Sequence, residues 1–146
     1  DNLPMLIQPS QADVRRFFCG AYAKSRSGSK LEPIEILASQ WIDEHPEYHA
    51  ELSDVDASLA NMHQVDPNRE NPFLHLSMHM SLSEQVQINQ PVGIRSISQQ
   101  LTLRLDSEHS AQHAMMECLA QVLWQAQQQG TAPDMDLYLE SLNRLI

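Results

Sequence analysis

NPFLHLSMHMSLSEQVQI, residues 71–88, is the stretch that decides the fold. It opens on an Asn-Pro pair, and this pair is a helix start signal because asparagine caps a first turn and proline suits the first helical position. Successive residues of a helix are separated by about 100°, so His75 and His79 fall on the same face as the apolar Leu82. The stretch therefore predicts a helix that directs two histidines, spaced i, i+4, toward a core.

Helical signals continue on both sides of this stretch. The clear helical patterns cover residues 10–26, 33–44, 72–88, 94–105, 108–129 and a last segment after Pro133, and the segments 47–52 and 55–62 can add a further short helix. The segments 47–52 and 55–62 are short, residues 63–70 form a polar loop, and no segment has the pattern of a strand. We therefore predict an all-α, single-domain bundle of six or seven helices over residues 10–146, after an irregular lead-in at residues 1–9.

Charge and composition exclude several classes of protein. The net charge of −10 disfavours duplex nucleic acid as a partner, because its backbone is also negative. No run approaches the roughly 20 apolar residues of a membrane-spanning helix, so we expect no membrane segment. Cys19 and Cys118 lie far apart without a CxxC motif. This spacing favours two buried thiols in a reduced, cytoplasmic protein.

The first predicted helix is the basic part of the chain. Five cations and one anion lie between Gln11 and Lys30, whereas the remainder is strongly acidic. The simplest interpretation is that this helix complements the acidic body of its own domain. The alternative is that Arg15 and Arg16 dock on an acidic protein partner.

Two pairs of histidines suggest a metal site. His75 and His79 form one pair, and His109 and His113 form the other, with Glu117 one further turn along. Two imidazoles spaced i, i+4 can bind one ion from a single helix, and facing helices of a bundle can complete the site. We therefore predict a mono- or dinuclear non-haem site for Fe, Zn or Mn with these five residues as ligands.

A third pair, His45 and His49, lies on either side of Pro46. Proline restarts the helix there, so His45 can act as a cap, whereas His49 lies inside the helix that follows. We therefore prefer His49 as the sixth ligand. The remaining candidates are weaker: Glu44 and Glu47 could complete the site, and His63 is expected on the surface.

The alternative to a metal site is a buried polar network. Buried imidazoles need hydrogen-bond partners, and neighbouring Asp, Glu and Ser side chains can supply them. The chain would then be a non-enzymatic interaction module with a basic docking helix. No phosphate-binding glycine loop, GxSxG or HExxH motif occurs, so the sequence identifies no catalytic residue, no organic cofactor and no reaction.

Two resemblances to known families complete the sequence evidence. The HxxxHxxxE pattern at residues 109–117 is similar in type to the ligands of hemerythrin-like proteins, and three-histidine DinB-like bundles are a comparable match. The longer resemblance rests on VRRFF (14–18), LEPIEILASQWIDEHPEYHAEL (31–52), NPFLHLSMHMSLSEQ (71–85), QPVGIR (90–95) and HSAQHAMMECLAQVLWQAQ (109–127). These stretches resemble the bacterial family catalogued as domain of unknown function 1841, over about residues 7–144. That resemblance implies a small, cytoplasmic, all-helical protein and brings no activity or functional residue.

Overall fold

The computed structural model describes residues 10–64 and 69–146, and these residues form helices and no strand. The predicted lead-in at 1–9 and the centre of the predicted polar loop, residues 65–68, lie outside the described residues. The all-α prediction is confirmed. The described ranges contain eight α-helices and one short 3-10 helix, which is more than the six or seven predicted, because both short segments are helical. None of the described helices is long and apolar enough to cross a membrane.

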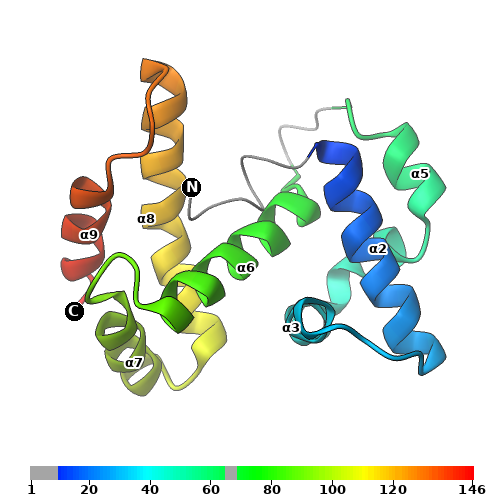
Figure 1. The fold of residues 1–146 in the computed structure, drawn as a ribbon, viewed down its shortest axis with the longest axis horizontal. Helices are drawn as coiled ribbons and strands as arrows, with labels where there is room; N and C mark the ends of the chain where they lie inside the picture. The colour runs from blue at the N-terminus through cyan, green and yellow to red at the C-terminus, as the bar shows by residue number, and fades with distance from the viewer. Residues whose placement is uncertain (1–9, 65–68) are drawn as a thin grey trace. The chain divides into compact units, whose positions relative to one another are not determined.

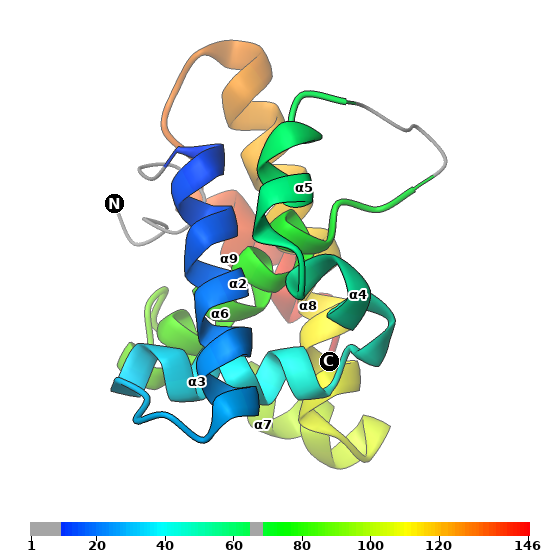
Figure 2. The same ribbon diagram turned by 90° about the vertical axis from the view of Figure 1, so that its right-hand side faces the viewer.

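The chain forms two compact units, and the first ends at Met80. Its elements are α2 (Gln11–Ser27), α3 (Pro33–Asp43), the 3-10 helix η1 (Pro46–Tyr48), α4 (His49–Leu52), α5 (Val55–Ala60) and the first part of α6 (Pro72–Ile88). Helix α2 contacts α3, α4 and α5 (Figure 2). The core of this unit gathers Phe18, Trp41, Leu52, Phe73 and Leu76. The first unit therefore holds the basic helix, His45, His75 and His79.

The second unit runs from Ser81 to Ile146. It contains the end of α6 and the helices α7 (Ile94–Leu105), α8 (Glu108–Gln129) and α9 (Met135–Asn143). The last three helices contact one another (Figure 1). Their fully buried side chains include Leu101, Leu119 and Leu142. The structure thus divides into two compact units, and the assignment of residues 10–146 to a single domain stays a prediction.

Local capping signals explain the helix boundaries. Ser10 accepts a hydrogen bond from the amide of Asp13 at the start of α2, and Ser107 does the same for α8. Gly28 ends α2 with a φ of 73°, a left-handed conformation that costs glycine little. Because these signals act within one turn, the sequence predicts most boundaries to within a residue or two.

The cysteines differ from the prediction of two buried thiols. Cys19 of α2 is buried, whereas Cys118 of α8 is partly exposed, and both are free. Burial raises the pKa of the Cys19 thiol. Cys118 has a less buried environment because its position on α8 lies beside the apolar face and not at its centre.

Candidate metal centre

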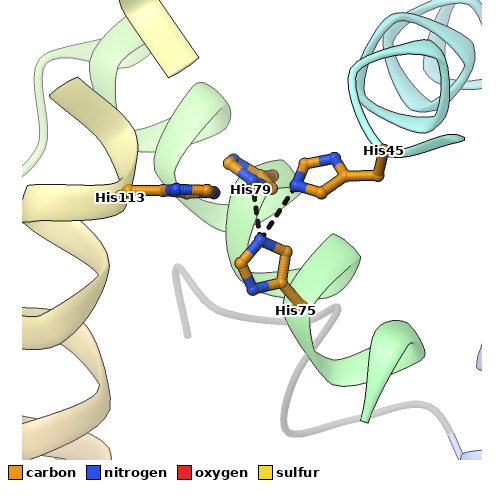
Figure 3. A group of neighbouring side chains, drawn as sticks. All are labelled: His45, His75, His79 and His113. Atoms are coloured by element: carbon orange, nitrogen blue, oxygen red, sulfur yellow. Dashed lines mark hydrogen bonds between the residues drawn. The ribbon is translucent and has the colours of Figure 1, made fainter. Parts of the chain in front are cut away.

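Three histidines of the first unit converge. His75 and His79 come from α6, and His45 comes from the turn after α3 (Figure 3). The Nε2 atom of His75 lies 3.0 Å from Nε2 of His45 and 3.2 Å from Nε2 of His79. The nitrogens that could bind an ion all lie within 4.8 Å of one another. We call His45, His75 and His79 the histidine cluster.

The local chain geometry explains how these side chains meet. The i, i+4 spacing of His75 and His79 places both on the buried face of α6. His45 follows the end of α3, where its amide donates to the carbonyl of Ile42, and the next residue is the proline that begins η1. His45 is therefore the point at which the chain turns, and its ring is buried.

In two of these rings, the Nδ1 atom forms a hydrogen bond outside the cluster. Nδ1 of His45 lies 2.7 Å from the carbonyl oxygen of Trp41, and Nδ1 of His75 contacts a carboxylate oxygen of Glu70. Carbonyl and carboxylate oxygens only accept hydrogen bonds, so both Nδ1–H groups donate. In the neutral ring, the remaining nitrogen then carries a lone pair. The Nε2 lone pairs of His45 and His75 therefore face the interior of the cluster.

This arrangement suits a cation. Two lone pairs on nitrogens 3.0 Å apart repel each other, and a cation bound by both nitrogens removes this repulsion. Nitrogens at typical Zn–N distances are about 3.3 Å apart in a tetrahedral site and about 2.9 Å apart in an octahedral one. The observed separations of 3.0 and 3.2 Å lie between these values. Two of the three nitrogen separations therefore match those around a single metal ion, and the third is within 4.8 Å.

Aromatic rings cover the cluster. The indole of Trp41 stacks on His79 with centroids 4.0 Å apart, and the Tyr48 ring stacks on His45 at 5.1 Å. Only 2% of His45 and 0% of His79 is exposed. Burial, with smaller effects from Glu70 and Glu47, raises the pKa of Tyr48 to about 12. The phenol therefore remains neutral near pH 7 and adds no charge to the cluster.

The cluster contains His45, whereas the sequence favoured His49. His49 is engaged elsewhere: its Nε2–H donates to the carbonyl of Ile42 at 2.8 Å, and its Nδ1 lies 3.0 Å from Nη2 of Arg26. The interpretation of His45 as a cap missed that its ring turns inward at the proline. The sequence also gave no sign of Glu70, which was assigned to a polar loop.

The other predicted ligands belong to α8. His109, His113 and Glu117 lie on α8 in the second unit, and Nε2 of His109 is 3.0 Å from Nε2 of His113. His113, also labelled in Figure 3, and Glu117 are exposed. Their role as ligands stays a prediction. The weaker candidates Glu44 and Glu47 are exposed.

The two arginines of the predicted docking face differ in exposure. Arg15 is buried with its guanidinium over the Phe73 ring, whereas Arg16 is exposed and pairs with Asp13. Another cation of the same helix, Lys24, donates to Glu35 of α3 at 2.8 Å, and this hydrogen bond lowers the pKa of Glu35. At least part of the positive charge of α2 is therefore used inside the first unit.

The model of a protein family described as Domain of unknown function (DUF1841) matches residues 10–144. Neither the search of curated proteins nor the search of solved structures gave a match.

Proposed function

Starting from a chain that belongs to the DUF1841 family, we propose that this protein binds one metal ion through the histidine cluster. One observation carries the proposal: the Nδ1–H groups of His45 and His75 are used by fixed acceptors, so their Nε2 lone pairs converge. The same pattern, a ligand histidine that donates its other N–H to a carboxylate or carbonyl, is common in metal sites, where it fixes the ring and raises its basicity.

The chemistry of the ligands limits the choice of metal. Imidazole nitrogens suit Zn and Fe, whereas Mn prefers oxygen ligands and binds more weakly to a nitrogen site. Among the described residues of the cluster, no carboxylate lies in a position to bridge two ions. We therefore propose a mononuclear site and rank Zn and Fe(II) ahead of Mn.

The fourth ligand decides between a structural and a catalytic site. Three protein ligands and a water molecule are typical of catalytic zinc, whereas four protein ligands are typical of structural zinc. We retain His109, His113 and Glu117 as candidates for the fourth ligand, on the basis of their spacing alone. Alanine variants of these three residues test the assignment, because the loss of a true fourth ligand should weaken metal binding, whereas the loss of a residue outside the site should leave it unchanged.

Elemental analysis tests the proposal directly. The full chain, purified without tag or chelator, should carry about one equivalent of Zn or Fe, and a chelator should lower its melting temperature because metal binding stabilises the folded state. The double variant His75→Ala/His79→Ala should lose the metal. Absence of metal after incubation with Zn(II), Fe(II) and Mn(II) would contradict the proposal. The cluster would then be a buried hydrogen-bond network without a metal.

A further inference from the structure

A second feature of the first unit is a pocket of about 800 Å³. It is lined by residues of α2, α4, α5 and the start of α6, together with the described residues between α5 and α6. Its apolar wall consists of Ala50, Ala57, Met62, Pro72 and Phe73. Pockets of this size accept small organic molecules. The question is which chemical group the polar part of the wall would recognise.

Arg15 is the unusual residue of this wall. Only 7% of it is exposed, and its guanidinium carbon lies 4.8 Å from the centre of the Phe73 ring. Its Nη1 donates to the carbonyl of Gln11 at 3.2 Å, whereas its buried Nε has no hydrogen-bond partner among the residues that the structure describes. A buried guanidinium normally pairs with a carboxylate, because an unpaired buried charge is costly.

The carboxylates around the pocket are already engaged. Glu51 pairs with Arg69, Asp54 accepts from the amide of Ala57, and Glu70 accepts from His75. Arg15 forms no ion pair within residues 10–64 and 69–146. The guanidinium of Arg15 therefore has no carboxylate partner among the described residues beside the pocket.

We infer that this pocket binds a small carboxylate with an apolar body, whose carboxylate group pairs with Arg15. Guanidinium groups bind carboxylates through paired, charge-assisted hydrogen bonds, and Arg15 has donors to spare. The apolar body of the ligand would lie against Phe73 and Met62. Such a ligand would suit both parts of the pocket wall. Its carboxylate would pair with the guanidinium of Arg15, and its hydrocarbon part would contact the apolar side chains.

The pocket and the histidine cluster share one residue. Glu70 lines the pocket and also accepts the Nδ1–H of His75. A carboxylate bound at Arg15 would therefore lie on the same wall as the group that orients a proposed metal ligand. The inference itself needs no metal ion, so it can be tested in chelator-treated protein and can fail or succeed independently of the proposed function.

Binding of benzoate to the full, chelator-treated chain tests the inference, with benzamide as its neutral analogue. Titrations followed by NMR should show saturable binding of benzoate and none of benzamide. Arg15→Met, which keeps the length and the apolar stem of the side chain, should weaken benzoate binding at least tenfold. Arg16→Met is the matched control, because Arg16 is its exposed neighbour on the same helix, and it should bind benzoate as the wild type does.

Three results would overturn the inference. These are equal binding of benzoate and benzamide, equal binding of benzoate to Arg15→Met and wild type, and binding of inorganic phosphate in place of benzoate. Arg15→Met should keep or raise the melting temperature, because it removes a buried charge without a partner carboxylate. If this variant does not fold, the Nε–H resonance of Arg15 in the wild type gives the answer: it should shift on addition of benzoate, and an unmoved resonance contradicts the inference.

Discussion

His45 and His49 carry the same side chain on either side of Pro46, yet the fold gives them different neighbours. His45 lies within 3.0 Å of His75, whereas His49 contacts Ile42 and Arg26. At the scale of the single residue, spacing along the chain does not decide between them. The turn of the backbone before Pro46 decides it, because this turn directs the ring of His45 toward His75.

This difference gives a matched pair of variants. His45→Ala removes a proposed ligand and should weaken metal binding by more than the 10- to 100-fold that is typical of losing an outer-shell partner. His49→Ala should leave metal affinity within a few-fold of wild type. Competition with a chromogenic chelator measures both affinities. Equal losses in the two variants would contradict the assignment of His45.

Glu70 is predicted to act on the metal through His75. Glu70→Ala removes the carboxylate that fixes the ring, so metal affinity should fall on the order of tenfold. Glu47→Ala is the control, since Glu47 is also an exposed carboxylate near Tyr48 but has no bond to the cluster. The same chelator competition measures the change. A fall in affinity for Glu47→Ala as large as that for Glu70→Ala would show that general charge is responsible.

At the scale of the element, α6 shows how local signals place a site. Oδ1 of Asn71 accepts hydrogen bonds from the amides of Phe73 and Leu74, as expected of an N-cap. The cap fixes where the helix begins and hence which face holds His75 and His79. The sequence contains all of this information within two turns.

Substitution of Asn71 therefore tests how much the N-cap of α6 contributes to the free energy of unfolding. Asn71→Ala leaves two amides of the first turn without their side-chain acceptor and should lower the free energy of unfolding by about 1 kcal/mol. Asn71→Ser keeps a capping oxygen and should remain close to wild type. Urea unfolding followed by circular dichroism measures both. A loss in the serine variant equal to that in the alanine variant would contradict the capping role.

At the scale of the whole molecule, a buried polar contact inside the second unit joins α9 to the end of α6. The hydroxyl of Tyr138 in α9 donates to Oε1 of Gln85 in α6 at 2.7 Å. Burial raises the pKa of Tyr138 above its usual value of 10. Because the folded state holds this proton more tightly than the unfolded state, the resulting stability is present below pH 10 and is lost as the pH rises further.

Alkaline unfolding tests this contact. The wild type should lose stability as the pH rises above about 10, and Tyr138→Phe should lose less over the same range because it has no proton to release at this position. Tyr22→Phe, a partly exposed position of α2, is the control and should keep the wild-type loss. Urea titrations at several pH values measure the slope. Equal slopes for wild type and Tyr138→Phe would contradict the prediction.

The sequence by itself determined the helical class, most helix boundaries and the shared face of His75 and His79. These features follow from caps, prolines, glycines and helical spacing, all of which act over a few residues. The third histidine of the cluster, the Glu70 acceptor and the burial of Arg15 were decided only by tertiary structure. His45 and His75 are 30 residues apart, and no local pattern encodes a contact over that distance. Such contacts depend on which buried faces pack together, so the site could be predicted only in part.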